Sequence, residues 1–332
     1  MVACSGDTAC ADGVPCTSDV ECEGGYCSAN GCAPVGWVYA PAATYVMGAP
    51  LDERGRHSLR ENGQHTVTLT RSFLVSRTTV TQGEWSALMG GTTPSMFTTC
   101  GADCPVVNIT WFEMLAYANA MSARDGFDEC YPLSGCTGTI GAGCSPGLDH
   151  CNGYTCDLAP LATPNLDCNG YRLPTESEWE YFARAGTTAP YATPTGTYDN
   201  WSPDVYDAAM DSAAWFMDNS AVTYVPSYDC SIWWPTAGPC GPHPVGLKAP
   251  NAWGLFDIAG NVYERVWDWS GDYPDPGSTV TDPTGPPSGT QKRMRGGAFN
   301  LWGQYLRIAY RTGPIPAAAY YDVGFRLVRT VP

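Results

Sequence analysis

The side chains best suited to chemistry lie in one stretch of the C-terminal third, from 248 to 269. This stretch sets four oxygen-bearing side chains among three tryptophans: Asp257, Asn261, Glu264 and Asp268. Carboxylate and amide oxygens are the ligands that hard cations such as Ca²⁺ prefer. Two glycines stand where the chain would turn. The pattern favours a buried structural centre with a hard cation as its candidate ligand, and it leaves open whether this centre is catalytic.

Sixteen cysteines are the second feature with chemistry of its own. They fall into local groups, with six at 4–32, two at 100 and 104, six at 130–168 and two at 230 and 240. Only four histidines are present, and none lies in a paired CxxC or HExxH arrangement that would indicate zinc. We therefore interpret the cysteines as local disulfides formed in an oxidising compartment, with the pairing left open.

Length and composition describe an acidic globular chain. Its 332 residues suffice for one large domain or two ordinary ones, and hydrophobic residues make up 44%. The formal net charge of −16 would repel a phosphate backbone, so we expect no nucleic-acid partner. No apolar run approaches the roughly 20 residues of a membrane helix, so we expect no transmembrane segment.

Three helices are predicted by the same start signal, a threonine followed three residues later by a glutamate. In such a capping box the threonine hydroxyl and the glutamate carboxylate satisfy backbone N–H groups that the helix leaves open, so these glutamates are interpreted as caps rather than catalytic acids. The pairs are Thr81 and Glu84, Thr110 and Glu113, and Thr175 and Glu178, and we expect the third helix to stop at Gly186. Short strands are expected at 37–40, 44–48, 65–70 and 72–76.

The cysteine spacing also suggests how the chain is divided. Residues 1–34 have almost no apolar pattern, so we expect a disulfide-stapled segment there, followed by one domain at 35–332. Within that domain, 127–170 is interpreted as a cysteine-rich insert. The sequence Val2-Ala3-Cys4 resembles the end of a bacterial lipobox, which makes Cys4 a candidate lipid anchor.

Several ordered motifs resemble those of the formylglycine-generating enzyme, or sulfatase-modifying factor, family. They cover roughly 36–330 and read Tyr45-Val-Met-Gly48, Pro105-Val-Val-Asn-Ile-Thr-Trp111, Tyr171-Arg-Leu-Pro-Thr-Glu-Ser-Glu-Trp-Glu180, Asn251 to Glu264, Arg295-Gly-Gly297 and Gly324-Phe-Arg-Leu327. The resemblance implies an α+β, C-type-lectin-like fold with few short helices and strands, much irregular loop and bound calcium.

For calcium, the resemblance implies a specific ligand set. It comprises the side chains of Asp257 and Glu264 and the backbone carbonyls of Gly260 and Val262. The alternative is that Asp257 caps a turn and that Glu264 pairs with an arginine such as Arg295.

For catalysis, the resemblance implies copper held by two cysteine thiolates just after the Arg-Gly-Gly motif, where a substrate cysteine is oxidised to formylglycine. No cysteine occurs at 298–307, and the last one in the chain is Cys240. Since soft thiolates are what bind Cu(I), we expect no copper, no catalytic residue and no such oxidation. Aromatic and amide side chains occupy this stretch instead and are the candidate ligand-binding residues, namely Phe299, Asn300, Trp302, Gln304, Tyr305 and, further on, Tyr310.

The favoured hypothesis is a secreted or surface-exposed binding protein whose partner is a protein or a small-molecule or glycan ligand. Two alternatives remain open at this point. One is an active enzyme of the family, performing formylglycine generation or a related sulfur or metal oxidation. The other is a structural subunit of a cell-surface assembly, for which the disulfides and the acidity would also be natural.

Overall fold

The computed structural model describes residues 25–28, 30–56, 61, 63–145, 148, 150–192, 208–232 and 237–331. Cys4 and the rest of 1–24, where the sequence predicts a stapled segment with a candidate lipid anchor, lie outside the described residues. None of the helices in the described part combines the length and the apolarity that crossing a membrane requires.

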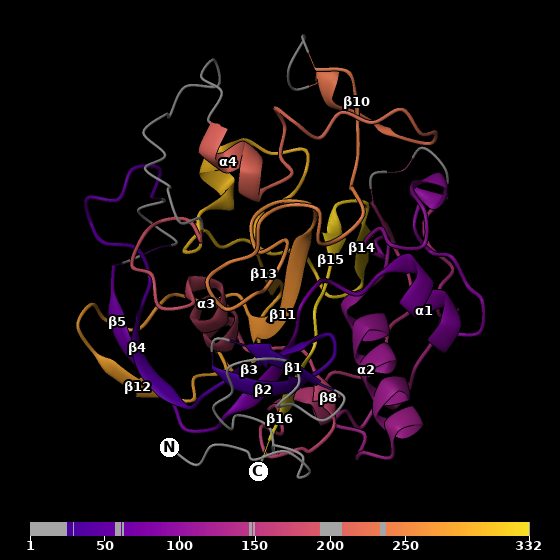
Figure 1. Ribbon diagram of the computed structural model, residues 1–332. Helices are drawn as coiled ribbons and strands as arrows, with labels where there is room; N and C mark the ends of the chain where they lie inside the picture. Colours follow the sequence, from indigo (N-terminus) through magenta and orange to yellow (C-terminus); the bar gives the residue numbers. More distant parts are fainter. Residues whose placement is uncertain are drawn as a thin grey trace.

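Few helices and many short strands make up the fold (Figure 1). The α-helices are α1 (Gln82–Leu88), α2 (Trp111–Asp125), α3 (Glu176–Arg184) and α4 (Ala208–Ala213). The 3₁₀ turns are η2 (Thr98–Cys100), η3 (Ala159–Leu161), η4 (Cys230–Ile232) and η5 (Gly303–Leu306). The strands are β1 (Gly25–Ser28), β2 (Gly31–Pro34), β3 (Trp37–Ala40), β4 (Ala43–Met47), β5 (His65–Leu69), β6 (Phe73–Ser76), β7 (His150–Asn152), β8 (Tyr171–Arg172), β9 (Tyr228–Asp229), β10 (Pro239–Cys240), β11 (Tyr263–Trp269), β12 (Thr279–Thr281), β13 (Lys292–Arg295), β14 (Ala318–Tyr320), β15 (Val323–Gly324) and β16 (Val328–Thr330).

All three predicted capping boxes are confirmed at the starts of α1, α2 and α3. In each, the threonine hydroxyl accepts from the N3 amide and the glutamate accepts from the threonine amide. The predicted end of α3 is confirmed, because Gly186 directly follows the C-cap and adopts a left-handed conformation with φ of 88°. The C-cap itself is Ala185, which is also left-handed with φ of 46°.

The sheets are small, and the central one has the order β13-β11-β15. Strand β11 pairs antiparallel with β13, which puts Glu264 opposite Arg295. It pairs parallel with β15, which puts Tyr263 opposite Val323. All seven residues of β11 are buried. Figure 1 shows β11 and β13 in the middle of the molecule, with α3 beside them and α1 and α2 further out on one side.

Two other sheets surround this centre. One has the order β3-β6-β16-β8 and the other the order β12-β5-β4. The largest hydrophobic core packs α1 and α2 against the central sheet, with Trp85, Trp111 and Phe325 all fully buried in it. A second core includes Trp179 and Phe182 of α3 together with Val67 of β5 and Val266 of β11.

Disulfides hold the regions that have little regular structure. In the described part of the chain they join Cys100 to Cys104, Cys130 to Cys168, Cys136 to Cys156, Cys144 to Cys151 and Cys230 to Cys240. No described cysteine is free. The prediction of local disulfides is therefore confirmed for these groups. The insert at 127–170 contains three of the bonds and is also tied to the C-terminal part, because β7 pairs with β14.

Candidate functional site

The loop that leads into β11 contains the predicted calcium ligands. Gly260 adopts φ of 76°, and a Cβ there would come within 2.0 Å of the Trp215 carbonyl oxygen, so only glycine fits. Asp257 is buried, and its pKa is raised by that burial. One of its oxygens accepts from the Gly246 amide at 2.8 Å and the other from the Asn261 side-chain amide at 3.3 Å.

Glu264 at the start of β11 is an ion-pair partner. Both of its oxygens accept from the Arg326 guanidinium, at 2.6 and 2.7 Å. One oxygen also accepts from the indole N–H of Trp179 at 2.7 Å. Glu264 and Arg326 are each almost fully buried. The sequence suggested Arg295 as the alternative partner, but Arg295 pairs with Glu180 of α3 instead.

As these residues stand, they do not fit a calcium ion. Both Glu264 oxygens face N–H donors, and the positive guanidinium of Arg326 would repel a divalent cation at the same carboxylate. Asp257 likewise receives an N–H at each oxygen. Gly260 and Val262 lie in the same loop, between these two side chains. The arrangement corresponds to the capped turn and buried ion pair that the sequence left open as the alternative, and calcium stays a prediction that depends on opening this pair.

The segment after β13 contains the predicted ligand-binding residues. Gly297 adopts φ of 75°, and a Cβ there would approach Leu306 to 2.8 Å, so this glycine lets the segment fold back on itself. The amide of Phe299 donates to the Asn261 carbonyl at 2.9 Å, which joins the segment to the Asp257 loop. Phe299 itself is fully buried and packs edge-on against Phe97. Phe299 is thus part of the core rather than a ligand-facing residue.

Asn300 forms the centre of a polar group beside this core. Its side-chain amide donates to the Tyr321 hydroxyl at 2.7 Å and to the Asp322 carboxylate at 3.2 Å. The side-chain carbonyl oxygen (Oδ1) of Asn300 is buried and has no hydrogen-bond partner among the described residues. An unpaired buried acceptor is costly, so this oxygen is a place where a ligand or a water could donate.

Three further tyrosines extend the group. The Tyr263 and Tyr310 hydroxyls are hydrogen-bonded, and burial is the main cause of a raised pKa at Tyr263, with the Asp322 charge adding to it. The Tyr305 and Tyr310 rings meet edge to face, with centroids 5.2 Å apart. We call the set the tyrosine cluster, and it consists of Asn300, Tyr321, Asp322, Tyr263, Tyr305 and Tyr310.

The remaining predicted ligand-binding residues lie at the border of the tyrosine cluster. Trp302 precedes η5, and Gln304 and Tyr305 are within it. These three side chains and that of Tyr310 are half-buried, so each has one part in the protein and one part in solvent. The structure thus places Asn300, Tyr305 and Tyr310 in the tyrosine cluster, with hydroxyl, amide and aromatic groups that can recognise a polar ligand. Trp302 and Gln304 lie beside Tyr305 at η5, and Phe299 meets the cluster from the core side, with its ring centroid 6.1 Å from that of Tyr321.

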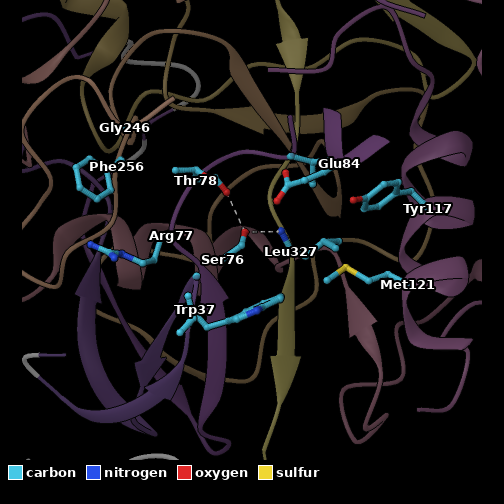
Figure 2. A pocket seen from close by; sticks show the side chains of 13 residues that line it. Trp37, Ser76, Arg77, Thr78, Glu84, Tyr117, Met121, Gly246, Phe256 and Leu327 are labelled. Carbon is cyan, nitrogen blue, oxygen red and sulfur yellow. Dashed lines mark hydrogen bonds between the residues drawn. The ribbon is translucent and has the colours of Figure 1, made fainter. Parts of the chain in front are cut away.

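A cavity of about 460 Å³ lies apart from the predicted ligand-binding residues (Figure 2). Arg77 and Phe256 stand on one side of it, and Glu84, Tyr117 and Met121 on the other. The Ser76 hydroxyl donates to the Thr78 carbonyl at 3.0 Å between them. Gly246 and Phe256 connect this cavity to the Asp257 loop, since Gly246 binds Asp257 and Phe256 precedes it.

Comparison with known proteins decides the family. The sulfatase-modifying factor enzyme 1-like domain matches residues 33–331, which is nearly the whole chain. The chain belongs to the sulfatase-modifying factor enzyme 1-like family. The sequence-based recognition and the α+β, C-type-lectin-like fold of the formylglycine-generating-enzyme type are therefore confirmed.

Among curated family relatives, the chaperone protein LppX of Paenibacillus barcinonensis is 30% identical over 206 residues, which are 61% of this chain and 64% of LppX. The formylglycine-generating enzyme of Thermomonospora curvata is 34% identical over 171 residues, which are 47% of this chain and 48% of the enzyme. The chain thus matches less than two thirds of the length of either relative.

Two solved structures share the fold over most of the chain. Treponema denticola variable protein 1 is 28% identical, with a TM-score of 0.65, and the match covers 89% of this chain and 95% of that protein. PvdO from Pseudomonas aeruginosa is 23% identical, with a TM-score of 0.58 and coverage of 89% and 94%, which is a likeness of fold alone.

Sequence reasoning missed three members of the site. Tyr263 and Arg326 lie within the motifs Asn251 to Glu264 and Gly324-Phe-Arg-Leu327 but were given no role of their own, and Asp322 lies just before the second motif. The signal that could have found them is the order of the central sheet. Pairing of β11 with β15 brings 263–264 next to 322–324, and this pairing joins segments about sixty residues apart.

Proposed function

We propose that the chain is a secreted or surface-exposed binding protein that uses the formylglycine-generating-enzyme scaffold without its oxidase activity. The observation that supports this most is the composition of the segment after Arg295-Gly-Gly297. It contributes Asn300, Trp302 and Tyr305 and no cysteine, and the described cysteines are all in disulfides. Thiolate ligands for copper are therefore absent from the described residues, and the residues at this position do not fit that metal.

The tyrosine cluster suggests what kind of ligand would bind. Its hydroxyl groups, the unpaired Asn300 carbonyl and the Asp322 carboxylate can exchange hydrogen bonds with hydroxyls or amides. Its half-buried rings offer flat apolar faces at low entropic cost, because a tyrosine has few rotatable bonds. Hydroxyl-rich glycans and exposed polypeptide segments both match this chemistry.

The disulfides support the proposed location. They persist in oxidising compartments and are rare in the cytosol, so an extracellular or cell-surface setting fits the five bonds described.

A printed array that carries glycans and extracellular-matrix proteins tests the binding role. We expect a specific ligand whose binding falls at least about tenfold in a Gln304→Ala/Tyr305→Ala variant, because truncation of a central aromatic contact costs more than about 1 kcal/mol. Gln291→Ala is the matched control, since Gln291 is an exposed glutamine outside the site. Binding that both variants retain equally, or no binding by the parent protein, would contradict the proposal.

A further inference from the structure

A second cavity, of about 400 Å³, lies where β5, β11 and the start of α3 meet. Its walls include His65 of β5, Glu176 of α3, Asp268 and Trp269 of β11, and Tyr273. None of the tyrosine cluster lines it, so it is a separate place in the fold. Cavities lined by buried ionisable groups are common locations of binding sites.

Four cationic side chains near this cavity already have anionic or aromatic partners. Arg293 and Arg295 lie 3.8 and 3.5 Å from the Glu176 carboxylate oxygens. Arg311 binds Glu176 through two hydrogen bonds, one of which measures 2.8 Å, and its guanidinium stacks on the Tyr273 ring. Lys292 donates to the Trp267 carbonyl at 2.8 Å and places its ammonium 3.9 Å from the ring centres of Trp111 and Trp269. Neither Arg311 nor Lys292 makes a hydrogen bond to Asp268.

Asp268 is the buried acidic side chain in this cavity wall that has an oxygen without a hydrogen-bond partner among the described residues. One of its oxygens accepts from the Glu176 amide at 2.7 Å, and the other has no hydrogen bond among the described residues. Its side chain is buried, with an exposed fraction of 3% for the residue. Burial and the neighbouring Glu176 charge raise the pKa of Asp268 to about 8, so the group is largely protonated near pH 7 and a cationic ligand would favour its ionised form.

His65 provides a second and independent observation. It is 2% exposed, it lines the same cavity, and its Nδ1 has no hydrogen-bond partner among the described residues. Burial lowers the pKa of His65, so the ring stays neutral near pH 7 and adds no positive charge. A neutral imidazole has one nitrogen that can accept an N–H.

We propose that this cavity binds a small organic amine in its ammonium form, with the ammonium on Asp268 and the body of the ligand against Trp269 and Tyr273. A buried ammonium–carboxylate hydrogen bond is among the strong ones, and the Trp269 and Tyr273 rings offer apolar contact to the body of the ligand. An anionic ligand fits less well, because Asp272 places another carboxylate in the cavity wall and Arg311 already holds Glu176. The assignment is independent of the proposed function of the tyrosine cluster.

Isothermal titration calorimetry with benzylamine tests the assignment, with benzyl alcohol and benzoate as uncharged and anionic analogues. We expect benzylamine to bind at least about tenfold more tightly than either analogue, and Asp268→Asn to remove at least about tenfold of that affinity. Asparagine can still accept from the Glu176 amide, so the variant should keep its fold, which circular dichroism checks. Asp275→Asn, an exposed aspartate outside the cavity, is the matched control and should bind as the parent does.

A second measurement does not depend on any variant. In protein labelled with ¹⁵N-histidine, saturating benzylamine should shift the His65 ring signals and leave those of the exposed His150 unchanged. The Gln304→Ala/Tyr305→Ala variant should bind benzylamine as the parent does, which separates this site from the tyrosine cluster. Equal affinity for benzylamine and benzyl alcohol, unchanged affinity in Asp268→Asn, or an unmoved His65 signal would each overturn the proposal.

Discussion

The sequence around Glu264 is compatible with two different partners for its carboxylate. From the sequence, a carboxylate in a turn-rich loop among tryptophans can bind either a metal ion such as calcium or an arginine side chain. The structure gives it Arg326, which follows 62 residues later. That pairing depends on which strands lie side by side, and no local pattern in the sequence contains this information. The sequence therefore predicted that the Glu264 carboxylate binds a positively charged partner, but it did not predict that this partner is Arg326.

Calcium binding can be tested at this residue. Because Arg326 already neutralises Glu264, we expect the thermal unfolding midpoint to stay unchanged when EDTA or excess calcium is added. A ligand that binds only the folded state must raise the midpoint, so differential scanning fluorimetry gives a direct readout. A midpoint that falls with EDTA and recovers with calcium would restore the four-ligand calcium site at Asp257, Gly260, Val262 and Glu264.

At the scale of elements, the helix starts were the easiest features to predict. A capping box uses residues three positions apart, so the sequence contains the whole interaction. The end of α3 at Gly186 was also predictable, although the left-handed conformation of Ala185 before it was not. The pairing of cysteines was harder. The six cysteines of the insert allow many pairings, and only the packing of the insert on α2 and β14 selects one.

Two capping glutamates should differ in their effect on stability. Glu178 is buried and binds Arg172 through two hydrogen bonds of 2.7 Å, whereas Glu84 is exposed and has no arginine partner among the described residues. In Glu178→Gln the buried Arg172 charge loses its counter-ion, so we expect a loss of about 3 kcal/mol or more in the free energy of unfolding. Glutamine still serves a capping box, so Glu84→Gln should cost less than about 1 kcal/mol.

Urea unfolding of the two variants measures this difference. Equal losses would mean that capping alone explains both glutamates and that the Arg172 pair contributes little.

At the scale of the whole molecule, the central sheet assembles the candidate site from distant segments. Strand β11 brings the Asp257 loop, β13 brings the segment with Asn300, and β15 brings Asp322. Ordered motifs made the family and the fold predictable from the sequence, and three of the predicted ligand residues, Asn300, Tyr305 and Tyr310, belong to the tyrosine cluster. Phe299 instead packs in the core, where its ring meets those of Phe97 and Tyr321. The amine cavity was not predicted, because its walls come from β4, β5, α3, β11 and several loops.

Oxidation of a peptide cysteine is the measurement that tests the central claim most directly. The purified protein is incubated with a Cys-x-Pro-x-Arg peptide, copper, a thiol reductant and oxygen, and aldehyde is detected by mass spectrometry. The formylglycine-generating enzyme of Thermomonospora curvata is the positive control. Because the segment after Arg295-Gly-Gly297 provides no thiolate for copper, we expect no aldehyde above the level of the protein-free reaction. Catalytic turnover of the peptide to formylglycine would contradict a binding protein without oxidase activity.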